Sequence, residues 1–194
     1  MARKFGHIAL FVVAGAFLQF APLAASPQIE DAPARFNAVA VNMNRGAAGT
    51  VEIVVDRWSS DADRDRLIGV MFDQGPERLL AELQKMPRMG YIRTPGRIGW
   101  DIHFAAHVPA KDGGERIVLV TDRHMGFREV ANRHRSVDYP FTVIELNVQK
   151  SGDGDGKISV ATRILPDKGG RIVTLENYDI QPVLLTKVTR ERVS

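Results

Sequence analysis

Gly49-Thr50-Val51-Glu52-Ile53-Val54-Val55-Asp56 is the stretch that decides the fold. Five of its eight residues are β-branched, and such side chains fit a pleated sheet better than a helix. A second strand is expected just upstream over Phe36–Asn42, with Gly46-Ala47-Ala48-Gly49 as the turn between the two. A short turn between neighbouring strands predicts an antiparallel hairpin.

Downstream of this hairpin the pattern becomes helical. Ser60 is expected to cap a helix over residues 61–73, because aspartates follow it in the first turns and apolar residues then recur at helical spacing. Gly75-Pro76 ends that helix and begins another over 76–86, since proline is well tolerated at the first helical position. The two helices are expected to pack against a sheet.

After Pro87 the chain returns to strand patterns separated by short, Gly-rich turns, with one short helix expected over 127–134. The expected strands are Gly90–Thr94, Trp100–Val108, Arg116–Thr121, Phe141–Lys150, Lys157–Leu165, Arg171–Asn177 and Pro182–Val188. These elements predict an α+β fold. Its sheet is a curved antiparallel sheet or partly open barrel of about eight strands, with the helical pair inserted after the second strand.

The N-terminal 26 residues read as a secretory signal peptide. Arg3 and Lys4 precede an apolar stretch over 8–20, and small residues follow, which predicts cleavage near Ala25/Ser26. Residues 27–35 are then a short Pro- and Ala-rich leader, and 36–194 form a single β-rich domain. The expected location is the periplasm or the extracellular medium, with no membrane span left after processing, because the apolar stretch is short for a bilayer.

Charge and cysteine content exclude several function classes. Loss of Arg3 and Lys4 lowers the formal charge from +3 to +1, and a nearly neutral domain is not expected to bind nucleic acid. The chain has no cysteine, so disulfides, a thiol nucleophile, a Cys-ligated zinc and an iron–sulfur cluster are all excluded. We expect no cofactor.

Asp101 and His103 are the candidate catalytic pair. Two residues apart on a strand, they share one face about 7 Å apart, where the carboxylate would orient the imidazole as a general base. Arg93 is the candidate anion stabiliser for a hydrolase of this kind. The alternative is an ordinary polar strand face. His103 and His107 are about 13 Å apart on a regular strand, too far to share a metal ion.

Two other stretches are candidate binding regions. Tyr91, Arg97 and Trp100 surround a Pro-Gly turn, and such a loop either recognises a partner or plugs the end of the sheet. Asp153 and Asp155 fall at the third and fifth positions of a calcium loop, but the ligands at both ends are missing. A hairpin loop is the favoured interpretation of this second stretch. The arginines between 123 and 135 are expected to form a solvated surface.

A resemblance to known proteins rests on four short stretches of the sequence. They are Asp56–Ser59, Gly90–Pro95, Val137–Phe141 and Asn177–Pro182. Together they resemble small exported bacterial proteins of uncharacterised function, over most of the chain from Phe36 onward. The resemblance implies export and no particular activity or site.

Three hypotheses for function follow. The first is a non-enzymatic binding module for a small apolar or amphiphilic ligand, or for a partner protein, held within the curved sheet. The second is a hydrolase that uses Asp101 and His103, and the third is a structural or chaperone-like envelope protein.

Overall fold

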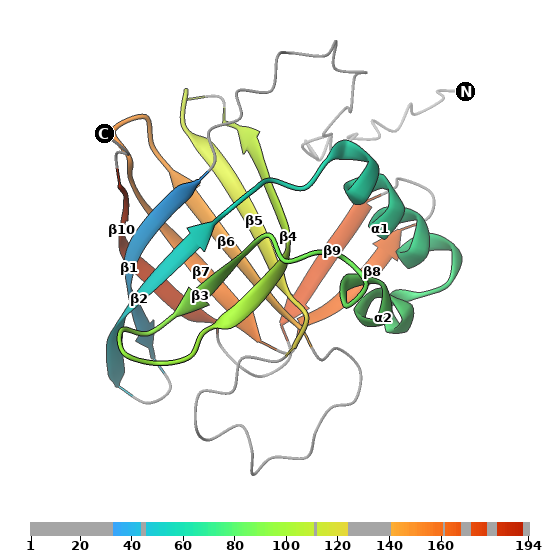
Figure 1. The fold of residues 1–194 in the computed structure, drawn as a ribbon, viewed down its shortest axis with the longest axis horizontal. Helices are drawn as coiled ribbons and strands as arrows, with labels where there is room; N and C mark the ends of the chain where they lie inside the picture. The colour runs from blue at the N-terminus through green and yellow to red at the C-terminus, as the bar shows by residue number, and fades with distance from the viewer. Residues whose placement is uncertain are drawn as a thin grey trace, which may run out of the picture. The chain divides into compact units, whose positions relative to one another are not determined.

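The computed structural model describes residues 33–43, 46–110, 112–123, 141–160, 162–167, 172–177 and 182–191. Eight of its strands form a closed barrel (Figure 1). These strands are β1 (Ala34–Asn42), β2 (Ala47–Val55), β3 (Gly90–Arg93), β4 (Trp100–Pro109), β5 (Glu115–Thr121), β6 (Thr142–Val148), β7 (Asp153–Val160) and β10 (Val183–Arg190).

The barrel is an up-and-down meander in which every neighbouring pair is antiparallel. The strands from β1 to β7 pair in chain order, and β10 then lies between β7 and β1. The predicted eight-stranded antiparallel sheet is confirmed, but the partly open form is wrong. Pairing of β10 with β1 closes the barrel, so its backbone donors and acceptors have partners all the way round.

The helical pair lies between β2 and β3, as predicted. Helix α1 (Asp61–Asp73) begins at Ser60, whose hydroxyl accepts from the Asp63 backbone N–H while the Asp63 carboxylate accepts from Ser60 N–H. The second helix is shorter than expected, because a 3-10 turn, η1 (Pro76–Arg78), precedes α2 (Leu79–Leu83). Buried side chains of both helices belong to the same apolar core as those of the barrel. Among the described residues no helix is both long and apolar enough to cross a membrane.

The region after β6 departs from the prediction. Residues 153–156, expected in a loop, begin β7, and the expected strand 157–165 is divided between β7 and a separate hairpin of β8 (Thr162–Asp167) and β9 (Ile172–Asn177). Gly154 explains the difference, because a Cβ there would lie 2.0 Å from the carbonyl oxygen of Asn147 on β6. The glycine therefore permits close strand pairing rather than a turn. The helix expected over 127–134 lies outside the described residues.

The interior of the barrel is filled by the side chains of its own strands. An eight-stranded barrel has an interior just wide enough for side chains to fill. The largest fully buried side chains on the barrel strands are Phe36, Ile53, Ile92, Ile102, Ile117, Leu119, Ile144, Leu146, Ile158 and Leu185. A ligand within the barrel would therefore have to displace this core.

A β-bulge in β4 changes which residues of that strand face inward. Ile102 pairs with Thr121 but Phe104 pairs with Val120, so β4 has one extra residue at His103. Beyond the bulge, His107 lies opposite Ile117, which is fully buried. Directly opposed residues share a face of the sheet, so the bulge turns His107 toward the barrel axis.

A second bulge does the same in β10. Leu185 pairs with Gly156 but Val188 pairs with Gly154, so one extra residue lies between them. Val188 is fully buried, and Arg190, two residues later, lies opposite the buried Phe36 with its guanidinium 5.8 Å from the centre of that ring. The bulge therefore places Arg190 on the inward face at the end of the barrel.

Lys187 in this second bulge has a left-handed backbone, with a φ of 51°. Because that conformation costs a non-glycine residue about 1–2 kcal/mol, Lys187→Gly is expected to raise the free energy of unfolding by about 0.5 kcal/mol after the entropy cost of glycine. Urea denaturation measures the change. The unfolding free energy of Lys187→Asn is expected to lie between those of the wild type and Lys187→Gly. A loss of stability in Lys187→Gly would show that the lysine side chain stabilises the bulge.

Candidate functional site

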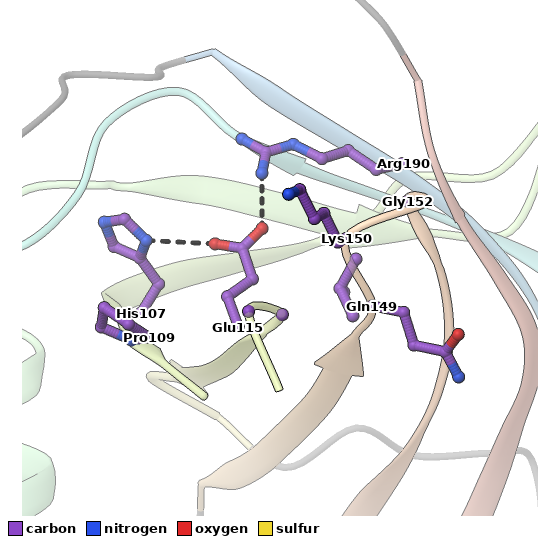
Figure 2. A pocket seen from close by; sticks show the side chains of 10 residues that line it. His107, Pro109, Glu115, Gln149, Lys150, Gly152 and Arg190 are labelled. Carbon is purple, nitrogen blue, oxygen red and sulfur yellow. Dashed lines mark hydrogen bonds and ion pairs between the residues drawn. The ribbon is translucent and has the colours of Figure 1, made fainter. Parts of the chain in front are cut away.

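Three ionisable side chains meet inside one end of the barrel, which we call the mouth. They are His107 at the end of β4, Glu115 at the start of β5 and Arg190 at the end of β10 (Figure 2). Glu115 lies on the inward face of β5, because Ile117 and Leu119, the second and fourth residues after it, are both buried. The two bulges bring His107 and Arg190 to the same level, so three separate strands build the group.

Glu115 joins the other two side chains. His107 Nδ1 donates to Glu115 Oε2 at 3.1 Å, and the Arg190 guanidinium donates to Glu115 Oε1 (Figure 2). The hydrogen bond from His107 holds the pKa of Glu115 below the ordinary glutamate value of 4.5. Partial burial opposes this lowering, and the charge of Arg190 adds to it. Glu115 is therefore a carboxylate at neutral pH.

Trp58, in the segment between β2 and α1, fixes the imidazole of His107 from one side. The two rings are stacked, with centres 4.3 Å apart and planes at 24°. The neighbouring Ser59 holds this segment on β4, because its N–H donates to Ala105 O and its hydroxyl accepts from Ala105 N–H. With Nδ1 bonded to Glu115 and one face covered, the imidazole directs Nε2 away from Glu115 (Figure 2), and no contact of Nε2 occurs among the described residues.

These side chains line a pocket of about 310 Å³. Turns β4–β5 and β6–β7 form its walls, and glycines in both turns leave backbone exposed to it. The lining residues are His107, Pro109, Gly113, Gly114, Glu115, Val148, Gln149, Lys150, Gly152 and Arg190. Pockets at the mouths of β-barrels are common places for small ligands.

The lowered pKa of Glu115 predicts a loss of stability in acid. A carboxylate whose pKa is lower in the folded than in the unfolded protein stabilises the fold above the unfolded value and loses that contribution as pH falls through the folded value. The free energy of unfolding should therefore decrease below about pH 4.5, and this decrease should be smaller in Glu115→Gln. Urea denaturation between pH 3 and 7 tests this. Equal slopes for the two proteins would exclude Glu115 as the source.

The structure does not bring Asp101 and His103 together as a pair. The bulge at His103 breaks the regular alternation on which their shared face depended. His103 instead donates from Nδ1 to Met86 O at 2.8 Å and lies 3.7 Å, through Nε2, from the carboxylate of Asp122. Asp101 lies 3.6 Å from Nε of Arg88.

Arg93, the candidate anion stabiliser, is bonded to Glu52 on the neighbouring strand at 2.7 Å. Its guanidinium also lies 5.0 Å from the centre of the Tyr91 ring, which Arg88 approaches to 5.3 Å. Arg93 is therefore engaged in a surface network of charges on β2 and β3.

Tyr91, Arg97 and Trp100 do not converge either. Trp100 lies opposite the buried Ile92, whereas Tyr91 is the next residue of β3 and so faces the other side of the sheet. Arg97 is exposed in the turn between β3 and β4.

Asp153 and Asp155 lie on the exposed face of β7, and Asp155 accepts from the amide of Asn147 at 3.0 Å. The strand holds this stretch extended, so it does not curl round an ion as a calcium loop does. Within the described part of the chain, no three acidic or histidine side chains cluster as metal ligands would. Of the arginines between 123 and 135, only Arg123 is described, and it pairs with Asp122.

Sequence reasoning missed Trp58, His107, Glu115, Lys150 and Arg190 as a group. Glu115 could have been found from the sequence, because it is a charged residue at a position where the alternation of β5 places apolar, inward-facing side chains. His107 and Arg190 could not have been found in this way. The regular alternation that holds before each bulge would place both of them on the outward face. No family model, curated protein or solved structure matches this chain.

Proposed function

We propose that the protein is a non-enzymatic binding module whose ligand occupies the pocket at the barrel mouth. The observation that carries this proposal is the convergence of His107, Glu115 and Arg190 from three strands on one pocket. A filled interior argues for this location over a site deep within the barrel. Polar groups at one end, with Pro109 and Val148 beside them, suit a small amphiphilic molecule.

Native mass spectrometry of the protein purified from its own cells tests the proposal. Pro109 is exposed, lines the pocket and lies opposite Glu115 on the inward face, so Pro109→Trp is designed to fill the pocket. Gln84→Trp, at the exposed end of α2, is the matched control. We expect a retained small molecule with the wild type and the control but not with Pro109→Trp. Retention of the small molecule by Pro109→Trp, or by none of the three proteins, would contradict the proposal.

The pattern of residues 1–26 supports a further part of the proposal, namely that the module acts outside the cytoplasm. The intact mass of the protein from its own envelope should correspond to a chain that begins near Ser26 or Pro27. A full-length chain found only in the cytoplasm would contradict export.

A hydrolase is the second candidate, because Asp122 lies beside His103. The imidazole has a fixed orientation, since Met86 O accepts from its Nδ1. In this version Nε2 of His103 takes the proton, and the Asp122 carboxylate beside it stabilises the imidazolium that forms. Turnover of simple esters that His103→Ala abolishes, in a variant that stays folded, would favour it over the binding module.

A further inference from the structure

We infer that the mouth pocket takes a small hydroxylated carboxylate, of about the size of a sugar acid. The inference rests on the proposed binding function and specifies the chemistry of its ligand. It follows from the charge of the pocket lining and from the hydrogen-bonding state of His107.

The charge of the lining favours an anion. Apart from His107, the ionisable side chains of the pocket are Lys150, Arg190 and Glu115, which leaves one positive charge in excess. Arg190 is bonded to Glu115, whereas Lys150 is exposed and has no ion pair among the described residues. An excess of one positive charge matches a carboxylate better than a dianionic phosphate ester, and Lys150 is the group that would bind it.

His107 adds a requirement for a hydroxyl group. The Glu115 carboxylate can only accept, so a neutral His107 ring has its proton at Nδ1, and its Nε2 is then an acceptor. A carboxylate oxygen against this lone pair would be repelled, whereas a hydroxyl would donate to it. The lining therefore calls for an anionic group near Lys150 and a hydroxyl donor near His107.

Size and surroundings limit the ligand further. About 310 Å³ accommodates a molecule of monosaccharide size but not a long acyl chain, and the adjacent barrel interior is occupied by buried side chains such as Phe36. The exposed backbone of the glycine-containing turns offers additional polar contacts to several hydroxyl groups. A sugar acid combines the charge, the hydroxyl donors and the size.

Three probes separate these requirements: glucuronate has both groups, glucose lacks the charge and acetate lacks the hydroxyls. Binding is measured by calorimetry and by fluorescence of Trp58 in a Trp100→Phe background, which leaves Trp58 as the single tryptophan. We expect glucuronate to bind at least about tenfold more tightly than either other probe, since each missing contact is a hydrogen bond to a charged or fixed group.

Two substitutions assign the contacts. Lys150→Met should weaken glucuronate about tenfold and leave glucose unchanged. Arg97→Gln removes an equal charge from the exposed turn between β3 and β4, and should change neither. His107→Phe keeps a ring against Trp58 but removes Nε2, so it should lower the preference for glucuronate over acetate. Urea denaturation checks that His107→Phe is folded.

Equal affinities for the three probes, or a loss with Arg97→Gln equal to that with Lys150→Met, would overturn the inference. The native ligand separates this failure from failure of the proposed function. If the protein retains a neutral molecule that Pro109→Trp excludes, the pocket is a binding site and only its assigned chemistry is wrong. If it retains nothing and binds no probe, both fail.

Discussion

Replacing Arg190 with methionine is expected to lower the free energy of unfolding by about 2–3 kcal/mol. Methionine keeps much of the side-chain volume over Phe36 but removes the charge that faces Glu115. The Glu115 side chain is only 17% exposed, so water cannot replace the lost partner fully. Urea denaturation at pH 7 measures the change.

The double variant Arg190→Met/Glu115→Gln should be more stable than Arg190→Met alone, because it removes the uncompensated carboxylate as well. Arg64→Met is the matched control, since the Arg64 side chain is 50% exposed and its pairs with Asp61 and Asp65 lie on the surface. Its expected loss is within about 0.5 kcal/mol. Equal losses for Arg190→Met and Arg64→Met would mean that solvent screens the pair at the mouth.

Gly90→Ala is expected to destabilise the barrel strongly. A Cβ at Gly90 would lie 2.0 Å from the carbonyl oxygen of Val54 and 3.0 Å from Cα of Val55. Both obstacles are backbone of the paired strand β2, so relief requires β2 and β3 to separate. We expect a loss of about 3 kcal/mol or more in unfolding free energy, measured by urea or thermal denaturation with circular dichroism.

Gly49→Ala is the control for this substitution. Gly49 also lies in a strand, but a Cβ there would meet nothing within 4 Å. Its expected effect is neutral or a gain of about 0.5 kcal/mol, because alanine restricts the unfolded chain. If Gly90→Ala melted within about 2 °C of the wild type, the close approach of β2 and β3 would not exist as described.

Local patterns were enough to predict most of the fold. The β-branched run at Val51–Val55 predicted β2, and the expected helix over 61–73 matches α1, because a capping serine, an acidic first turn and helical spacing all agree there. Closure of the barrel was not predictable in this way. It depends on pairing of β1 with β10, which are far apart in the sequence.

The positions of the candidate catalytic residues differ from the expected ones for another physical reason. The prediction for Asp101 and His103 assumed strict alternation along β4, and one extra residue at His103 breaks it. The same extra residue turns His107 inward, and the extra residue in β10 does so for Arg190. Neither bulge carries a glycine to mark it in the sequence, since one lies at His103 and the other at Thr186–Lys187.

The histidine side-chain nitrogens, observed by long-range ¹H–¹⁵N NMR before and after glucuronate is added, test the central claim most directly. The account predicts that His107 has its proton on Nδ1 and that its bare Nε2 shifts on binding, while the His103 ring, which is bonded to Met86 O, does not respond. A response at His103 alone would contradict the assignment of the ligand site to the barrel mouth, and a His107 proton on Nε2 would contradict the hydroxyl contact inferred for the ligand.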